Sequence, residues 1–367
     1  MFINQIKYRN HSYFMRLALT QAQKNLANTN ENPSVGCVIT KNNSVISVGC
    51  TSINGRPHAE YNAINQCRTN LRNAELYVTL EPCSHYGKTP PCTKSIINSG
   101  IKKVFFSIND PDMRSYNKCS KLLKNKKIRV KKGICAQETN LFYKSYIKSK
   151  SSFLPFVTCK LAVSKDFFTI NKKRKWITNK FSRGRVHLMR SNHDCIMTSC
   201  KTIIKDNPSL TCRIDGLKNK SPSRIILDSK LKIPLNSNIV KEATRYRTII
   251  FYNKFNKKKI KLLKNFKIEF LKLSIDIDGN LDLHEMLIKA KELGFYRIFL
   301  ESGMKLVTSF LYKNLVDDLN LFISNKNLRN NGKNNIKKQL ELFLKNKKHI
   351  IGKVNLFGEK LITYKIK

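Results

Sequence analysis

The stretch Leu80-Glu81-Pro82-Cys83-Ser84-His85-Tyr86-Gly87-Lys88-Thr89-Pro90-Pro91-Cys92, together with His58-Ala59-Glu60, carries the strongest signal in the sequence. One histidine and two cysteines are ligands that zinc prefers, and three protein ligands leave the fourth position for a water molecule. We therefore predict a zinc site formed by His58, Cys83 and Cys92. Zinc lowers the pKa of a bound water to about 7, so such a site can supply hydroxide at neutral pH.

Prolines place the predicted ligands at the beginnings of helices. Pro57 precedes His58, and Pro90-Pro91 precedes Cys92. Because proline is favoured in the first turn, we predict one helix from near Pro57 through Ile64 and another after Pro91. At a helix start, Glu60 can converge with His58, and we interpret Glu60 as a proton shuttle from water to a leaving amine. The His-x-Glu and Pro-Cys elements are typical of zinc deaminases.

Outward from this motif, helix and strand patterns alternate along the first part of the chain. We predict a helix over residues 13–25, strands over 35–40, 44–48, 76–80 and 104–108, and a hairpin turn at 41–43. This alternation favours an α/β layered domain with a largely parallel portion of sheet. The polar amphipathic segment 136–152 is predicted to be a helix that connects two domains, covering residues 1–150 and 153–367.

The second part of the chain repeats the alternation and predicts another α/β domain. Strands are expected over 156–163, 196–198, 224–227, 248–252 and 297–300, with helices over 181–191 and 283–293. The basic, asparagine-rich segment 325–348 is expected to contain a poorly ordered loop. The chain has no Gly-x-Gly-x-x-Gly sequence, so the usual dinucleotide-binding fingerprint is absent.

Composition limits the class of protein and its partners. The 367 residues suit two domains, and no stretch has the roughly 20 apolar residues that span a bilayer. Residues 1–10 lack the apolar segment of a signal peptide, and eleven cysteines suit reduced thiols or metal ligands, so we expect a cytoplasmic protein. A homo-oligomer is compatible with the sequence.

The net charge of +46 has two readings. A nucleic-acid binder would neutralise phosphates with lysine and arginine, but it would also show clustered basic residues or a binding motif. Here lysines are scattered among many asparagines and isoleucines, the residues of A/T-rich codons. We therefore expect no nucleic-acid partner, although the charge can attract phosphorylated small molecules.

The motifs Asn32-Pro33-Ser34-Val35-Gly36-Cys37, His58-Ala59-Glu60 and the stretch 77–92 resemble the bifunctional deaminase–reductase family of riboflavin biosynthesis. Eight residues separate Cys83 from Cys92, whereas two separate the cysteines of nucleoside, cytosine and tRNA deaminases. The resemblance implies a cytidine-deaminase-like three-layer αβα domain, followed by a dihydrofolate-reductase-like α/β domain. It makes His58, Cys83 and Cys92 zinc ligands, Glu60 the catalytic acid/base and Asn32 a contact of the pyrimidine ring. His85 and Lys88 are either substrate contacts or polar surface residues.

In the second half, the resemblance implies two further sets of residues. The expected NADPH contacts are Ala162, Trp176, Thr202, Asp206, Gly303, Met304, Lys305 and Leu306. The expected substrate contacts are Arg190, Leu210, Arg213 and Glu301, whose two arginines suit a ribose phosphate. The implied activity is hydrolytic deamination of a phosphoribosylamino-diaminopyrimidinone, followed by NADPH-dependent reduction of the ribosyl side chain to ribityl.

Several positions depart from the family pattern. Ser164-Lys165-Asp166-Phe167 replaces Ser-Leu-Asp-Gly, residues 171–175 replace a Ser-Gly-x-Ser segment, and Asn117 and Cys119 stand where glycines are expected. One alternative is therefore a deaminase with a decayed reductase domain. The others are a nucleic-acid base deaminase with a basic accessory domain, and a zinc-stabilised protein that binds nucleic acid without turnover.

Overall fold

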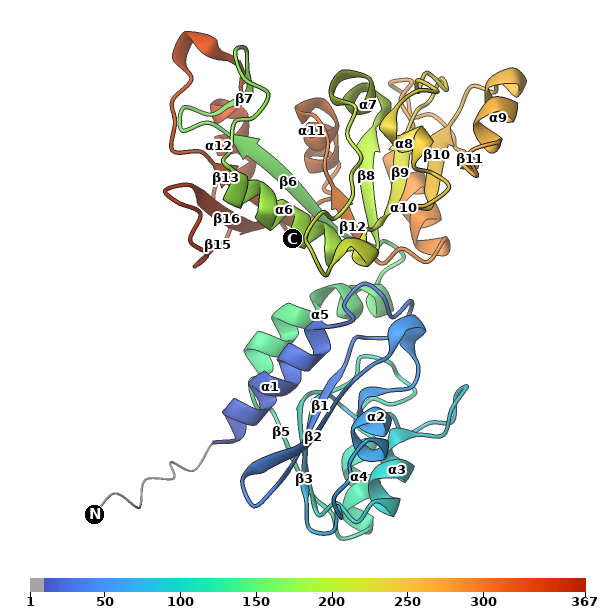
Figure 1. Cartoon of the computed structure of the whole chain (residues 1–367), viewed down its shortest axis with the longest axis vertical. Coiled ribbons are helices and arrows are strands. Elements are labelled where there is room, and N and C mark those ends of the chain that lie inside the picture. Colours follow the sequence, from blue (N-terminus) through green and yellow to red (C-terminus); the bar gives the residue numbers. More distant parts are fainter. Residues whose placement is uncertain (1–9) are drawn as a thin grey trace. The chain divides into compact units, whose positions relative to one another are not determined.

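The computed structural model describes residues 10–367, and the chain divides into two compact units between Ser152 and Phe153. The expectation of no signal peptide rests on residues 1–10, which lie outside the described residues except for the last. Within the described part, no helix combines the length and the apolar character needed to cross a membrane. Each unit has its own sheet with helices on both faces (Figure 1).

The sheet of the first unit has five strands in the order β2-β1-β3-β4-β5. These are β1 (Gly36–Lys41), β2 (Ser44–Cys50), β3 (Glu75–Leu80), β4 (Lys103–Ile108) and β5 (Arg129–Lys132). β1 is antiparallel to both neighbours, whereas β3, β4 and β5 run parallel, as the alternating pattern predicts. Asn42 and Asn43 both have left-handed φ angles (51° and 61°), the conformation of the tight hairpin turn between β1 and β2.

Helices cover both faces of this sheet. They are α1 (His11–Gln23), α2 (Ala59–Asn65), α3 (Cys92–Asn98), α4 (Cys119–Asn125) and α5 (Ala136–Ser151), with a 3₁₀ turn, η1 (Ile53–Gly55), before α2. α1 packs its apolar side onto Val38, Tyr77 and Phe105. The opposite strand faces pack with α2, α3 and α4. A Cβ on Gly49 of β2 would collide with the backbone of α2, so glycine here lets α2 lie close to the sheet.

The sheet of the second unit has nine strands in the order β11-β10-β9-β8-β12-β6-β13-β16-β15. They are β6 (Phe156–Val163), β8 (Cys195–Ser199), β9 (Ser223–Leu227), β10 (Thr248–Tyr252), β11 (Glu269–Lys272), β12 (Arg297–Leu300), β13 (Asp318–Ile323), β15 (His349–Ile351) and β16 (Lys360–Lys365). The strands from β11 to β13 run parallel, and β16 and β15 add an antiparallel edge. β7 (Phe168–Asn171) and β14 (Gly332–Asn335) form a separate two-stranded sheet.

Two apolar clusters fill the spaces on either side of this large sheet. One holds α10 (Leu283–Glu292), α11 (Met304–Tyr312) and α12 (Lys337–Leu344). The other holds α6 (Lys180–Ser191), α7 (Cys200–Asp206), α8 (Asn238–Lys241) and α9 (Lys257–Lys264), while η2 (Lys218–Lys220) and η3 (Arg329–Asn331) are short turns. The predicted class, two successive α/β domains, is therefore the one observed.

Two expectations differ from the structure. Segment 325–348 contains η3, β14 and α12 rather than only a loop, because Ile336 and Leu340 bury their side chains in the core. α5 does form at 136–151, but it belongs to the core of the first unit rather than acting only as a connection. Its Tyr143 is buried, donates a hydrogen bond to the carbonyl of Ser34 (2.9 Å) and lies 2.6 Å from the hydroxyl of Thr79.

Candidate active sites

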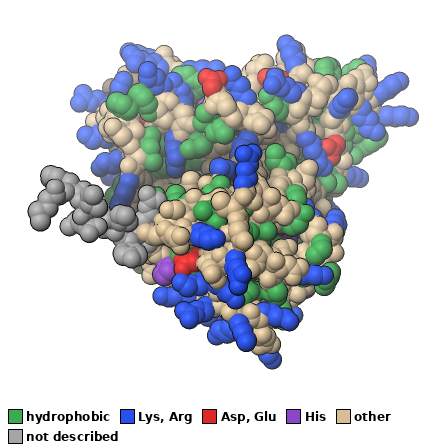
Figure 2. Space-filling model, turned by 60° about the horizontal axis from the view of Figure 1, so that its bottom comes forward, with side chains coloured by type: hydrophobic (Ala, Val, Ile, Leu, Met, Phe, Trp, Pro, Cys, Tyr) green, Lys and Arg blue, Asp and Glu red, His purple; other side chains and the backbone are tan. Residues whose placement is uncertain are grey.

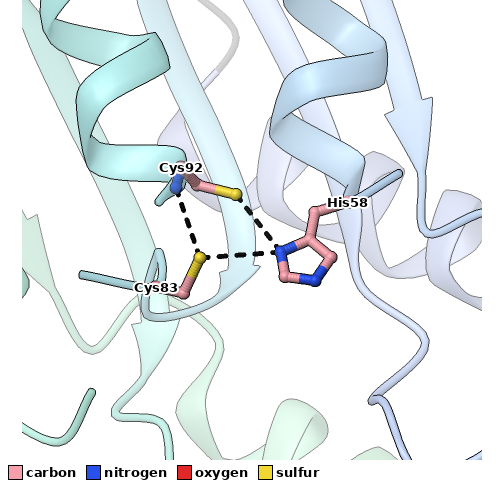
Figure 3. A group of neighbouring side chains, drawn as sticks. All are labelled: His58, Cys83 and Cys92. Atoms are coloured by element: carbon pink, nitrogen blue, oxygen red, sulfur yellow. Dashed lines mark hydrogen bonds between the residues drawn. The ribbon is translucent and has the colours of Figure 1, made fainter. Parts of the chain in front are cut away.

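The three predicted zinc ligands come together in the first unit. His58 immediately precedes α2, Cys83 lies in the loop after β3, and Cys92 is the first residue of α3. The predicted positions of His58 and Cys92 at helix starts are therefore correct. Figure 3 shows Nδ1 of His58 facing the sulfur atoms of both cysteines.

The distances between these atoms fit zinc. Nδ1 of His58 lies 3.6 Å from Sγ of Cys83 and 3.4 Å from Sγ of Cys92, and all three donor atoms lie within 4.8 Å of one another. Bonds of about 2.3 Å to sulfur and about 2.0 Å to nitrogen at a tetrahedral angle separate the two donors by about 3.5 Å. Both nitrogen–sulfur distances thus already match the spacing that a shared tetrahedral ion requires.

Hydrogen bonds within the group favour an ionised thiol. The backbone N–H of Cys92 donates to Sγ of Cys83 (3.2 Å). Hydrogen bonds from Cys92 and from His58 hold the pKa of the Cys83 thiol well below its usual value. A thiolate is the form that binds a metal ion.

Glu60 lies in the first turn of α2 and is buried, with 3% of its surface exposed. Burial, with a smaller contribution from Cys83, raises the pKa of its carboxyl group to about 7. The carboxyl group interacts with Cys83, His58 and Cys92, so it belongs to the same cluster. A carboxyl group beside a metal-ligand cluster and shielded from solvent can take up and release a proton there.

Arg56 is a residue of this site that the sequence analysis does not name. Its guanidinium donates to the hydroxyl of Thr89 (2.6 Å) and lies 3.4 Å from Nε2 of His58. Thr89 belongs to the eight-residue insert between the cysteines, so Arg56 ties that insert to the histidine. Its position directly before Pro57-His58 is the only sequence signal that could have indicated it.

Glu81 organises the loop that follows β4. Its carboxylate accepts hydrogen bonds from the backbone N–H groups of Asp110, Asn117 and Cys119. Asn117 has a φ of 59°, a conformation that asparagine tolerates better than most residues, and Cys119 begins α4. The two departures from glycine in this loop are therefore accommodated.

The other predicted contacts of the first unit lie in loops near the cluster in sequence. Asn32 is half-buried, and its side chain lies against Gly55 of η1, close in sequence to His58. His85 is hydrogen-bonded through Nδ1 to the buried hydroxyl of Ser115 (2.9 Å). Lys88 is exposed in the same insert. Their roles toward a substrate remain predictions.

In the second unit, several predicted cofactor contacts lie near the carboxyl ends of the central strands of the sheet. β6, β8 and β12 are parallel neighbours, and ligands of such sheets bind beyond the carboxyl ends of the strands. Ser199 ends β8, and Ser302 follows β12. With Thr202 of α7 they form a group of three hydroxyls, 3.1–3.2 Å apart.

Gly303 follows directly as the residue before α11, and Met304, Lys305 and Leu306 form its first turn. A helix start beside hydroxyl groups suits a phosphate. The remaining predicted cofactor residues are spread around the same strand ends. Ala162 lies near the end of β6, Asp206 is the exposed last residue of α7, and Trp176 is exposed in a loop with the guanidinium of Arg183 5.0 Å from its ring centre.

The predicted substrate residues Arg190 and Glu301 form an ion pair. The guanidinium of Arg190 donates through Nε and one NH2 group to both carboxylate oxygens of Glu301 (3.0 and 2.9 Å). It also donates to the carbonyl of Thr211 (2.9 Å). Burial raises the pKa of Glu301, but Arg190 and Lys160 outweigh this and bring it down to about 2. The sequence predicts that the guanidinium of Arg190 binds a phosphate through two hydrogen bonds. In the structure those two hydrogen bonds go to the carboxylate of Glu301.

Lys160 of β6, which the sequence analysis also does not name, completes this charged group. Burial lowers its pKa, while Glu301 opposes that effect. Leu210 has a φ of 55° and a buried side chain in the apolar cluster beneath α6 to α9. Arg213, three residues further, is exposed. The structure brings Arg190 and Glu301 into contact, and it places Leu210 and Arg213 on the loop whose Thr211 touches Arg190.

Comparisons with known families agree with both halves of this description. Residues 8–108 match the cytidine and deoxycytidylate deaminase zinc-binding region, and residues 155–348 match the RibD C-terminal domain. The fold and the first site therefore define a protein with a zinc-binding deaminase domain joined to a second domain of the RibD type.

Relatives that match over most of the chain are more specific. The riboflavin biosynthesis protein RibD of Aquifex aeolicus is 36% identical, covering 85% of this chain and 86% of the relative. RibD of Actinobacillus pleuropneumoniae is 34% identical, covering 88% and 86%. The solved diaminohydroxyphosphoribosylaminopyrimidine deaminase/5-amino-6-(5-phosphoribosylamino)uracil reductase of Thermotoga maritima superposes with a TM-score of 0.82 at 30% identity, covering 96% and 98%. Acinetobacter baumannii RibD superposes with a TM-score of 0.80 at 27% identity over the same shares.

This chain belongs to the RibD family of riboflavin biosynthesis proteins. The family resemblance and the fold class predicted from the sequence are thereby confirmed.

Proposed function

We propose that this chain catalyses two successive steps of riboflavin biosynthesis. The first is hydrolytic deamination of 2,5-diamino-6-(5-phosphoribosylamino)pyrimidin-4(3H)-one, with zinc as cofactor. The second is reduction of the ribosyl side chain by NADPH, which gives 5-amino-6-(5-phosphoribitylamino)uracil. The observation that carries the proposal is the convergence of His58, Cys83 and Cys92 beside the buried Glu60, in a chain of the RibD family.

In the first domain, which we assign to residues 1–150, His58, Cys83 and Cys92 hold the zinc ion. Zinc supplies a hydroxide from water at neutral pH when it is bound. The carboxyl group of Glu60 would accept a proton from the attacking water and pass it to the leaving amino group, which would depart as ammonia. Asn32 holds the pyrimidine ring, and burial of Glu60 keeps bulk water from competing for the proton.

In the second domain, which we assign to residues 153–367, the hydroxyl group of Thr202 and the start of α11 at Gly303 bind NADPH, with Ala162, Trp176 and Asp206 around them. NADPH supplies the hydride, and the protein supplies binding and orientation. The charged group at Glu301 and Arg190 faces the ribosyl side chain, and Arg213 attracts its phosphate. The ordered Arg190–Glu301 pair favours a working reductase over a decayed one.

We further infer a cytoplasmic enzyme that acts on a phosphorylated pyrimidine rather than on nucleic acid. The long insert between Cys83 and Cys92 separates this chain from the nucleic-acid deaminases. Lysine and arginine side chains are also spread over the face seen in Figure 2 rather than gathered in one patch. A dispersed positive charge attracts small anions without forming a specific groove.

The direct test is to incubate the purified protein with the phosphorylated diaminopyrimidinone and NADPH, and to identify the product by mass spectrometry. A product that is both deaminated and reduced supports both steps. A product that is only deaminated rejects the reductase half, and no change in the substrate rejects the proposal.

The role of Glu60 has a separate test. Glu60→Ala should lower ammonia release by at least about a hundredfold, because general acid–base catalysis contributes about 10²–10⁴-fold. Zinc content, measured by elemental analysis, should stay at one ion per chain, and reduction of added deaminated intermediate should be unchanged. Ammonia release at the wild-type rate would show that Glu60 is not the proton shuttle.

A further inference from the structure

Arg224 of β9 is the largest fully buried side chain of the described residues, and it carries a charge. Burial lowers its pKa to about 10, so the guanidinium is still protonated at neutral pH. A buried charge is costly unless it is paired and its hydrogen-bonding groups are satisfied. What Arg224 contacts therefore indicates what it is for.

Its contacts fall into two sets. Nε and one NH2 group donate to Oγ1 of Thr248 on the neighbouring strand β10, and that NH2 group also donates to the carbonyls of Ile239 and Tyr246. These bonds fix the guanidinium in place. The other NH2 group donates to the carbonyl of Ser209 (3.1 Å) and to the carboxylate of Glu242 (3.3 Å).

Glu242 also binds Ser209, so Arg224, Ser209 and Glu242 are joined in a closed ring of hydrogen bonds. Its second carboxylate oxygen accepts a hydrogen bond from the hydroxyl of Ser209 (2.9 Å). The backbone and the side chain of Ser209 are thus both held by the Arg224–Glu242 pair. Two interactions on one loop residue fix its orientation as well as its position.

The loop is held again two residues later, at the charged group described above. The carbonyl of Thr211 accepts a hydrogen bond from Arg190 (2.9 Å) and lies 2.9 Å from Nδ1 of His187. Leu210 lies between the two anchors with a left-handed φ of 55°, a conformation that a leucine adopts only when its surroundings enforce it. Arg224 and Arg190 therefore bind the backbone carbonyls on the two sides of Leu210.

We propose that Arg224, acting with Glu242, is a positioning residue of the reductase: it holds the loop 207–213, which carries Leu210 and Arg213, in the conformation that meets the phosphoribosyl substrate. The inference rests on the proposed function, because it takes this loop as part of the substrate site. Arg224 acts through Ser209, and among the residues that the structure describes it forms no hydrogen bond with Arg190 or Glu301.

Three variants weaken the hydrogen bonds among Arg224, Glu242 and Ser209 to different degrees. Ser209→Ala removes only the hydroxyl bond to Glu242, Glu242→Gln removes the charge of the partner, and Arg224→Lys keeps the charge but loses the fork. Glu269→Gln is the matched control, because it breaks the exposed Arg247–Glu269 pair in the same unit. The deaminase of the same chain is an internal control for folding.

The readout is binding and reduction of the deaminated intermediate, 5-amino-6-(5-phosphoribosylamino)uracil. We expect Glu242→Gln and Arg224→Lys to raise its Kd and KM about tenfold, and Ser209→Ala about threefold, with kcat within about twofold of wild type. The KM for NADPH, ammonia release and the properties of Glu269→Gln should be unchanged.

A lowered Tm with wild-type Kd and KM in Ser209→Ala and Glu242→Gln would overturn the proposal and leave Arg224 a structural residue. Binding also separates this proposal from the proposed function. A wild-type protein that binds the intermediate without reducing it refutes the reductase activity, while the Kd series still decides the role of Arg224. A wild-type protein that does not bind the intermediate overturns both.

Discussion

The two candidate sites are built in different ways. The site of the first unit draws its metal-ligand cluster from residues 58–92, and two of its members begin helices. The site of the second unit draws on residues between Lys160 and Leu306, which become neighbours only because distant strands pair. The first site is held by the nitrogen and sulfur donor atoms of three neighbouring residues, and the second by the Arg190–Glu301 ion pair and a group of three hydroxyls. A site of the first kind can be identified from a short motif, whereas a site of the second kind depends on the fold.

This comparison predicts that damage to one site spares the other, and the largest effect should come from a zinc ligand. Cys83→Ala removes one of three ligands, so zinc affinity should collapse and ammonia release should fall by at least about a thousandfold. Reduction of added intermediate should remain at the wild-type rate. Elemental analysis and the two assays check this, with Cys67→Ala as the control cysteine outside the cluster. Loss of reduction in Cys83→Ala would show that the two sites are coupled.

Glu301→Gln damages the site of the second unit instead of the site of the first. It leaves the guanidinium of Arg190 buried without its counter-charge, which should lower the free energy of unfolding of the second unit by about 3 kcal/mol. Reductase activity should fall strongly while zinc content and ammonia release stay unchanged. Denaturant unfolding and the two assays measure this, and Glu292→Gln, which breaks an exposed pair with Lys289, is the control. An unchanged stability would mean that the pair contributes nothing to the fold.

The same pair predicts a pH dependence. The pKa of Glu301 lies near 2 in the folded chain and near 4.5 in an unfolded chain, so its stabilising effect is complete above pH 4.5. As the pH falls from 4.5 towards 2, the unfolded state takes up the proton first, and about 3 kcal/mol of stability should be lost. Unfolding of wild type and Glu301→Gln, compared at pH 6 and pH 3, isolates this contribution. Equal losses in both proteins would assign the acid sensitivity to other carboxylates.

The smallest expected effect belongs to Arg56. Arg56→Met removes the bond to Thr89 and frees the insert, but it leaves all three zinc ligands in place. The KM of deamination should rise about threefold to tenfold, in line with the loss of one charged hydrogen bond. Steady-state ammonia release measures this, with the exposed Arg68→Met as the control. A loss of zinc would instead show that Arg56 supports His58 directly.

Several elements with a clear apolar period were predictable, although the buried strand β13 was not predicted. β6, β10 and β12 begin and end at the predicted residues, and the other predicted strands differ by one or two residues at their ends. α4 and β5 were missed because their sequences, CSKLLKN and RVKK, are rich in lysine and bury few side chains. β14 and α12 in segment 325–348 were missed for the same reason, since the two core residues of the segment stand among polar ones.

The zinc cluster was predictable for two reasons. One histidine and two cysteines are typical zinc ligands, and the prolines before His58 and Cys92 indicate that these two residues lie at helix starts. Arg56, Lys160 and Arg224 were not, because they are three among 70 basic residues and only their surroundings distinguish them. The sequence also could not predict that the guanidinium of Arg190 binds the carboxylate of Glu301. Its partner Glu301 is 111 positions away and follows β12, whereas Arg190 lies in α6, the helix that precedes the neighbouring strand β8.

The insertion of β12 between β6 and β8 has a consequence for synthesis of the chain. Phe156 pairs with Arg297, so the centre of the second sheet cannot close until nearly 300 residues have been translated. The first unit is complete at Ser152, and domains generally fold in the order in which they are made. A nascent chain can therefore acquire its metal ion on the ribosome while the second half is still an open, aggregation-prone polypeptide. Slow translation after residue 152 would lengthen that exposure, and chaperone dependence should follow the second half rather than the first.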